Sequence, residues 1–198
     1  MSYAIIGFGK IGHALARAFA RNGIEVSVAT SRDPASFASD AAAVGPTIIP
    51  KTLAEAVKAD VIFLAVRFES YAEVAKVLPN WKGKTIVDVM NTFAPPAELD
   101  GLPSSAFVAN AFTGARLVKG FNHLAAAVLG QDPAVQGGRR VVFLASDDDG
   151  AAAEIGALAE KLGFAPIKLG GLSEGGLLVH ARGINWGRLI FKDLITFD

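Results

Sequence analysis

The sequence predicts a single α/β domain built on a doubly wound, mostly parallel β-sheet. Short apolar runs alternate with alanine-rich helical stretches along most of the 198 residues. A glycine-rich turn follows the first apolar run directly and opens a helix. The run at residues 61–66 is apolar throughout, as expected of a strand covered on both faces of a parallel sheet.

The elements follow from hydrophobic periodicity and from Gly and Pro punctuation. Strands are expected at residues 3–6, 25–29, 47–49, 61–66, 85–89, 117–120, 141–144 and 167–169. Helices are expected at 11–22, 34–44 after an Asp33 cap, 53–58, 71–78, 105–112, 151–162 and 177–191. The loop expectations are 91–103 and a flexible surface loop at 131–138. One domain therefore spans residues 1–198, with a C-terminal helical extension from about residue 173.

Composition excludes several classes of protein. Hydrophobic residues make up 52% of the chain and charged residues 19%, below the ~25% usual for soluble domains, so the chain is not disordered. Nineteen Lys+Arg balance nineteen Asp+Glu, so no global field favours nucleic acid or an anionic membrane. Cysteine is absent, which removes disulfides and thiolate chemistry. No targeting peptide or membrane span is expected. The sequence predicts a soluble, cytoplasmic protein, and its apolar balance suggests a homodimer.

The sharpest motif is the turn Gly7-Phe8-Gly9-Lys10-Ile11-Gly12. In a Rossmann-like dinucleotide fold, the first glycine permits the tight turn and the second admits the pyrophosphate. The third lets the helix pack on the strand. A tight turn in an unrelated α/β fold is the alternative. The order strand, turn, helix and second strand within ~30 residues favours dinucleotide binding.

The end of the second strand carries Thr30-Ser31-Arg32. NAD sites usually place a carboxylate there, whereas an Arg accommodates the 2′-phosphate of NADP. Arg32 offers a permanently charged planar fork, and the two hydroxyls can donate to phosphate oxygens. Asp33 precedes Pro34 and suits a helix cap. The motif favours NADP(H) over the alternative, a solvated Arg32 beside a turn serine.

These motifs, with others along nearly the whole chain, resemble the family of NADP-dependent reductases of the deazaflavin coenzyme F420. Related domains occur in membrane ferric reductases. Besides the two motifs above, the resemblance rests on residues 61–66, Asp88-Val89-Met90-Asn91, Val118-Lys119-Gly120-Phe121-Asn122, Ser146-Asp147-Asp148, Leu169-Gly170-Gly171-Leu172 and Glu174-Gly175-Gly176.

The resemblance implies a nicotinamide side lined by Ala65, Val66, Arg67, Asn91 and Thr92. It implies a pocket for the second substrate at Phe121, Asn122 and His123. Family members often have proline where this chain has Arg67, and a small hydroxyl residue in place of His123.

The function expected is hydride transfer between NADP(H) and a flavin-like ring (deazaflavin or flavin) or another small redox compound. Such transfer needs stacked rings more than a catalytic dyad, and no convincing dyad is present. The alternatives are a redox-sensing NADP(H)-binding module without turnover and, ranked last, an imine or carbonyl reductase. The latter would need a proton donor.

Other polar and aromatic residues have simpler interpretations. Among the three histidines, His123 is the best candidate donor, while His13 and His180 suit packed or surface positions. The histidines do not show zinc spacing, so no metal site is expected. The run at 147–149 is interpreted as a helix cap. Trp81 is placed in a loop, facing solvent or a partner.

Overall fold

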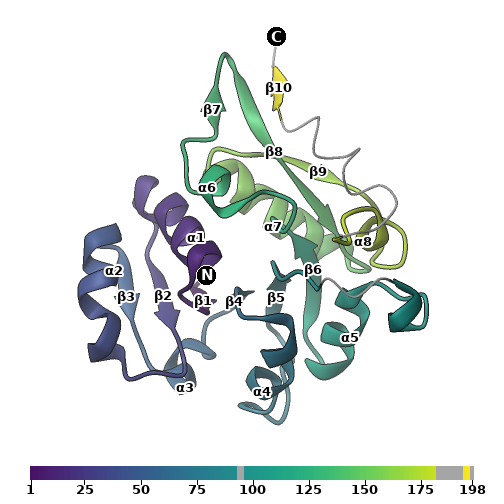
Figure 1. Ribbon diagram of the computed structural model, residues 1–198, viewed down its shortest axis with the longest axis horizontal. Coiled ribbons are helices and arrows are strands. Elements are labelled where there is room, and N and C mark those ends of the chain that lie inside the picture. The colour runs from purple at the N-terminus through teal and green to yellow at the C-terminus, as the bar shows by residue number, and fades with distance from the viewer. Residues whose placement is uncertain (93–95, 182–193, 197–198) are drawn as a thin grey trace.

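The computed structural model describes residues 1–92, 96–181 and 194–196. Its described strands form one sheet (Figure 1). They are β1 (Tyr3–Ile6), β2 (Val26–Ala29), β3 (Ile48–Pro50), β4 (Val61–Leu64), β5 (Thr85–Asp88), β6 (Arg116–Gly120), β7 (Ala134–Val135), β8 (Gly138–Ala145), β9 (Ala165–Lys168) and β10 (Leu194–Thr196).

The first six strands are parallel neighbours in the order β3-β2-β1-β4-β5-β6. This is the strand order of doubly wound dinucleotide-binding folds, with the switch point between β1 and β4. The α/β, Rossmann-like, mostly parallel sheet expected from the sequence is therefore confirmed. Beyond β6 the sheet continues through β8, which is antiparallel to β6 and parallel to β9.

Helices cover both faces of the sheet. They are α1 (Lys10–Arg21), α2 (Ala38–Val44), α3 (Leu53–Ala56), α4 (Tyr71–Ala75), α5 (Ser104–Ala111), α6 (Ala126–Leu129), α7 (Asp149–Lys161) and α8 (Gly175–Leu178). Single 3-10 turns occur at Pro34–Phe37, Phe68–Ser70 and Pro96–Leu99. None of the described helices is long and apolar enough to cross a membrane.

Alternate strand residues point to opposite faces and build two hydrophobic clusters. Ile5 and Phe63 pack with α1, α2, α6 and α7, whereas Ala4 and Ile62 pack with α3, α4 and α5. A third, smaller cluster joins β8 and β9 to Val179, just after α8. The sheet is thus buried on both faces, which explains the uninterrupted apolar run in β4.

Three local expectations were wrong. The loop at 131–138 contains β7, and a tight turn at Gln136 and Gly137, both with positive φ, leads directly into β8. Trp81 is 1% exposed, because its ring packs edge-on against Phe112 and its Nε1 donates to the carbonyl of Ala75. The predicted helix at 177–191 ends at Leu178, within α8.

The rest of that predicted helix, from residue 182 to 191, lies outside the described residues. The strand β10 that follows, antiparallel to β8, was not expected from the sequence.

Two predicted helix caps are confirmed. Asp33 accepts a hydrogen bond from the Ala35 amide, and Asp148 accepts one from the Ala151 amide at the start of α7.

Candidate functional site

The glycine turn between β1 and α1 owes its shape to missing side chains. Gly7 has φ +100°, and a Cβ there would lie 2.3 Å from the carbonyl oxygen of Ala65. A Cβ on Gly12 would lie 2.0 Å from the carbonyl oxygen of Gly7. A Cβ on Gly9 would meet no atom within 4 Å. Two of the glycines therefore allow close packing of the backbone, while Gly9 faces open space.

That open space lies at the amino end of α1. Gly9 is the N-cap and provides no side-chain cap, and no acidic residue occupies the first turn. The first amides of a helix have no intrahelical acceptor and carry the positive end of the helix dipole. An anionic group can therefore approach the backbone here and accept hydrogen bonds from it, as a dinucleotide pyrophosphate does in this type of turn.

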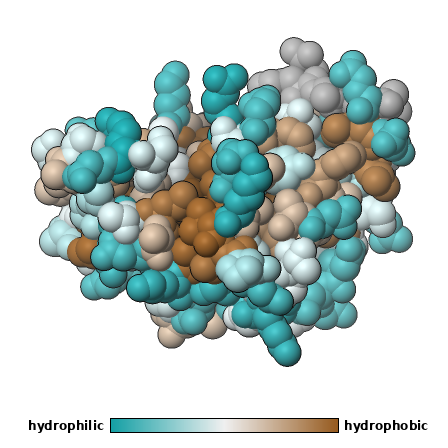
Figure 2. Space-filling model, turned by 90° about the horizontal axis from the view of Figure 1, so that it is seen from below, coloured by the Kyte–Doolittle hydropathy of each residue, from teal (hydrophilic) through white to brown (hydrophobic). Residues whose placement is uncertain are grey.

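A groove of about 560 Å³ runs from this turn across the carboxyl ends of β1, β2 and β4. It is lined by Ile6, Gly7, Phe8, Gly9, Thr30, Ser31, Arg32, Leu53, Ala65, Val66, Arg67, Ser70, Glu73 and Val74. The face seen from below, where α3 and α4 lie lowermost in Figure 1, carries an apolar area between polar side chains (Figure 2). We call the groove that runs across the carboxyl ends of β1, β2 and β4 the main groove.

Arg32 is a free cation on one wall of the main groove. Its guanidinium lies 5.6 Å from the ring centre of Phe37, and its amide donates to Oγ1 of Thr30 at 3.0 Å. Among the described residues no carboxylate pairs with Arg32, and that of Asp33 is engaged in capping the next helix. The guanidinium is therefore held near an aromatic ring with its donors available to a phosphate.

Ala65, Val66 and Arg67 line the same groove as Thr30, Ser31 and Arg32. They directly follow β4 and so form the wall opposite the end of β2, across β1. Arg67 is exposed and lies 3.6 Å from the Glu69 carboxylate. The structure thus brings the predicted residues of β1, β2 and β4 together in one place. Sequence reasoning missed Leu53, Ser70, Glu73 and Val74, because their helices carry no motif.

The predicted residues at the ends of β5 and β6 do not line the main groove. Beneath them lies a buried ion pair, in which Nζ of Lys119 is 3.2 Å from Oδ2 of Asp88. Lys119 also donates to the carbonyl of Met90, while Oδ1 of Asp88 accepts from the Met90 amide. Burial lowers the pKa of Lys119, against the opposing effect of Asp88. The pair fixes the peptide that precedes Asn91.

Asn91 and Asn122 form an amide clasp above this pair. Nδ2 of Asn91 donates to the Asn122 carbonyl at 2.8 Å, and Nδ2 of Asn122 donates to Oδ1 of Asn91 at 2.9 Å. Nδ2 of Asn122 also donates to the carbonyl of Val179 at 2.8 Å. Oδ1 of Asn122 is buried without a hydrogen-bond partner among the residues that the structure describes. It is an acceptor that a ligand amide or a water molecule could satisfy.

The other three residues predicted at the ends of β5 and β6, which are Thr92, Phe121 and His123, are largely buried. Thr92 is 7% exposed and follows the clasp. The ring of Phe121 is fully buried edge-on against Phe63 and Phe164, and its backbone has φ +61°. His123 is 6% exposed, with Nε2 3.2 Å from the Val141 carbonyl. Phe121 and His123 thus contribute their side chains to the core, at the edge where β5 and β6 end.

Lys10 and Ile11 complete the predicted glycine-turn residues. Ile11 packs against the core on the inner side of α1. Lys10 is exposed and lines a second groove, on the outer side of α1. No group of three or more His, Cys, Asp or Glu residues placed to hold a metal ion occurs in the described part of the chain.

Comparisons with known proteins agree with this geometry. Residues 2–92 match the model of the family described as NADP oxidoreductase, coenzyme F420-dependent. The crystal structure of a hypothetical protein from Sinorhizobium meliloti is 38% identical, covers 91% of this chain and 90% of its own, and has a TM-score of 0.86. An Arthrobacter sp. FB24 structure, described as an F420-dependent NADP-reductase by assignment, is 24% identical, covers 96% and 94%, and has a TM-score of 0.73.

A curated relative is the metalloreductase STEAP3 of Rattus norvegicus, 30% identical over 175 residues. The match covers 85% of this chain but 34% of the relative, so the chain spans about a third of the length of the curated relatives it matches. The family match lies over β1 to the end of β5, which contains the glycine turn and the main groove. Through residues 2–92, the chain belongs to the family described as NADP oxidoreductase, coenzyme F420-dependent.

Proposed function

We propose that the chain binds NADP(H) in the main groove and transfers hydride between it and a flavin-like ring or another small redox acceptor. The pyrophosphate would lie at Gly9 and the amino end of α1, and the 2′-phosphate at Ser31 and Arg32. The single observation that carries the proposal is the free Arg32 guanidinium in the groove that Gly9 opens. When bound, the reduced dinucleotide supplies two electrons and one proton as hydride, and the acceptor takes its second proton from water.

The residues at the ends of β5 and β6 have a positioning role in this proposal. The Lys119–Asp88 pair fixes the peptide at Met90, and the clasp fixes the side chains of Asn91 and Asn122. The unpartnered Oδ1 of Asn122 would accept a hydrogen bond from the nicotinamide carboxamide or from the second substrate. Thr92 and the backbone at Phe121 and His123 would border the ring.

A ring-to-ring transfer is favoured over reduction of a carbonyl or imine by the burial of two histidines. His123 is buried with Nε2 at the Val141 carbonyl, and His180 is 2% exposed. Both side chains are thus packed in the interior, which does not favour either as a proton donor to a substrate carbonyl.

The proposal is tested by titrating the protein with NADPH and NADH, in the parent and in Arg32→Ala. The parent should prefer NADPH. Loss of the charged phosphate contact should weaken NADPH binding by about 1.5–3 kcal/mol, or ~10- to 100-fold, and leave NADH binding unchanged. Lys82→Ala, which removes an exposed cation from a distant turn, is the control. Equal affinity of the parent for both dinucleotides would defeat the phosphate assignment.

The acceptor is tested by NADPH oxidation with flavins, deazaflavins, quinones and ferric chelates. Turnover with a tricyclic ring compound supports the proposal, and the absence of turnover with all of them would favour the redox-sensing module.

A homodimer and a cytoplasmic location are further proposals. The family resemblance supports the dimer. Met1 and Leu102 are the exposed large hydrophobic residues among the described side chains, so an apolar face does not.

A further inference from the structure

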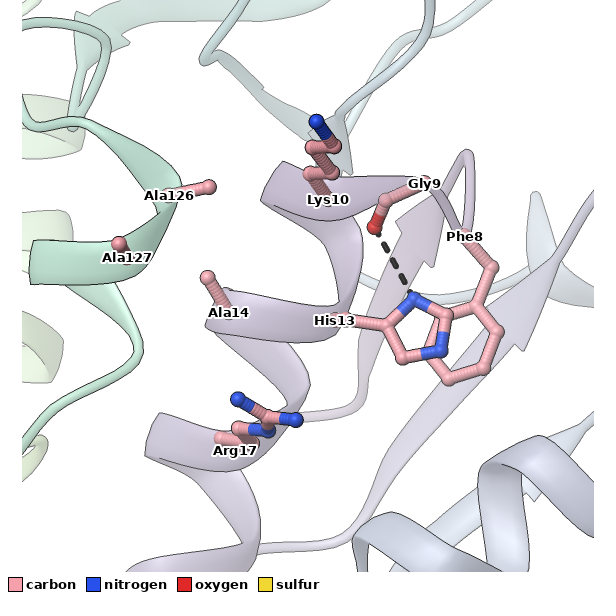
Figure 3. Close-up of a pocket in the computed structure, with 8 residues that line it drawn as sticks. All are labelled: Phe8, Gly9, Lys10, His13, Ala14, Arg17, Ala126 and Ala127. Atoms are coloured by element: carbon pink, nitrogen blue, oxygen red, sulfur yellow. Dashed lines mark hydrogen bonds between the residues drawn. The ribbon is translucent and has the colours of Figure 1, made fainter.

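A second groove, which we call the α1 groove, lies on the other side of the glycine turn. It has a volume of about 440 Å³ and is lined by Phe8, Gly9, Lys10, His13, Ala14, Arg17, Ala126 and Ala127. Figure 3 shows Lys10 and Arg17 along the outer side of α1, between the alanines of α6 and the rings of His13 and Phe8. Phe8 and Gly9 also line the main groove, so the two grooves adjoin.

The charges of the α1 groove are all of one sign. Its lining contains the cations Lys10 and Arg17 and no carboxylate. Helix α1 as a whole contains no acidic residue, although the chain has nineteen of each charge. Some surface cations elsewhere have a carboxylate partner at short range, as in Lys76–Glu73 at 2.7 Å. Lys10 and Arg17 form no ion pair with the described residues, so their charges are available to an anion.

The groove also has a built aromatic wall. The imidazole of His13 stacks on the ring of Phe8 with centroids 3.8 Å apart and an interplanar angle of 19°. Nδ1 of His13 lies 3.0 Å from the Gly9 carbonyl, to which it donates, so the ring is held in a fixed orientation. The opposite wall consists of the small side chains of Ala126 and Ala127. The groove thus combines a flat apolar lining with two free cations.

We infer that the α1 groove receives the anionic arm, a phosphate or carboxylate, of the second substrate. The inference rests on the proposed function, because it takes the dinucleotide to lie in the main groove. The phosphate of the dinucleotide's adenosine half would then be bound by Arg32, which lines the main groove and not the α1 groove. The two cations Lys10 and Arg17 then remain available to the second substrate, which must approach the same glycine turn.

Flavin mononucleotide and riboflavin give a matched test, because they share one ring system and differ in a single phosphate. Their binding to protein saturated with NADP⁺ is measured by calorimetry, and their KM values at saturating NADPH. The parent should bind flavin mononucleotide more tightly than riboflavin, by about three- to tenfold for an exposed charge contact. Arg17→Gln should remove this preference, and Arg17→Lys should retain much of it.

Arg21→Gln is the matched control. It removes a cation from the same helix one turn further on, outside the groove, where the guanidinium donates to the Gly130 carbonyl. Equal binding of the two flavins by the parent would overturn the inference. So would a loss of NADPH affinity in Arg17→Gln, which would make the α1 groove part of the dinucleotide site. Failure of the proposed function appears separately, as equal affinities for NADPH and NADH. In either case, the ratio of the affinities for flavin mononucleotide and riboflavin tests whether the α1 groove binds the phosphate.

Discussion

Gly9 and Gly12 lie three residues apart in one motif, yet the structure indicates a different physical reason for glycine at each position. At Gly12 a methyl group would overlap the Gly7 carbonyl, so the constraint is on folding. At Gly9 the backbone has φ −87° and the space around the absent Cβ is open, so an alanine fits the empty protein. We therefore expect glycine at position 9 to matter for ligand binding and not for folding.

This difference predicts opposite results for two alanine substitutions. Gly12→Ala should lower the melting temperature, because the carbonyl of Gly7 must move by more than a small adjustment. Gly9→Ala should leave the melting temperature close to that of the parent and weaken NADPH binding at least ~10-fold, because its methyl group takes the place of the approaching pyrophosphate. Thermal unfolding and dinucleotide titration measure the two effects. Undiminished NADPH affinity in Gly9→Ala would place the pyrophosphate elsewhere.

Single residues also show what the sequence could not specify. The roles of Gly7, Arg32 and Asp33 follow from local chemistry, so the turn, the groove wall and the cap were predictable. Trp81 was misplaced because its neighbours Asn80 and Lys82 are polar, and its burial depends on Phe112, far along the chain. Contacts of this kind have no signal within a window of neighbouring residues.

At the scale of elements, the buried pair of Lys119 and Asp88 joins β6 to the loop after β5. Removing one partner of a buried ion pair leaves an uncompensated charge, which typically costs about 3–5 kcal/mol. Lys119→Met should therefore lower the free energy of unfolding by about that amount. The double variant Lys119→Met/Asp88→Asn should recover part of it, since neither charge then remains.

Urea unfolding of the parent, both single variants and the double variant gives the coupling free energy between the two positions. Additive effects would show that the two side chains act independently, contrary to the geometry. Partial recovery in the double variant distinguishes the charge effect from a packing defect at Lys119, which Asp88→Asn would not relieve.

A second prediction concerns the start of β1. The Ser2 amide donates to Oδ2 of Asp60 at 2.7 Å, and the Ser2 hydroxyl adds a bond of 3.1 Å. These bonds lower the pKa of Asp60 below its ordinary value of 3.8. Because the folded-state pKa is the lower one, the stabilisation is present above pH 3.8 and is lost as the pH falls through the folded value.

Asp60→Asn should therefore be less stable than the parent near neutral pH, and the two should converge as the pH falls from about 5 to 2. Chemical unfolding at several pH values measures this convergence. Glu25→Gln, which removes an exposed carboxylate next to the start of β2, is the control for a general effect of removing one negative charge. A constant offset between Asp60→Asn and the parent at all pH values would contradict the assigned bonds.

Helix boundaries were predictable to within two residues where periodicity and caps agree, as in α1 and α7, whereas the strand expected at 61–66 ends at Leu64. They were not predictable where the partner lies far away in the chain. The hairpin of β7 and β8 is short and polar at its tip, and β10 pairs with β8 across more than 50 residues. The end of α8 at Leu178 coincides with the capture of the Val179 carbonyl by Asn122, a contact between distant segments.

At the scale of the whole molecule, the main groove draws on β1, β2 and β4 and on the helices that follow them. A ligand there contacts both halves of the sheet around the switch point and binds the folded state alone. At a concentration of 100 times its dissociation constant, such a ligand raises the free energy of unfolding by about 2.7 kcal/mol.

For a domain of this size that gain corresponds to a rise of roughly 5–10 °C in melting temperature. NADPH should produce it, while NADH at the same concentration should produce a smaller rise, because its adenosine half lacks the phosphate that Arg32 would bind. In Arg32→Ala the two rises should become equal. A parent protein stabilised equally by both dinucleotides, or by neither, would show that the exposed guanidinium in the main groove is not a phosphate site.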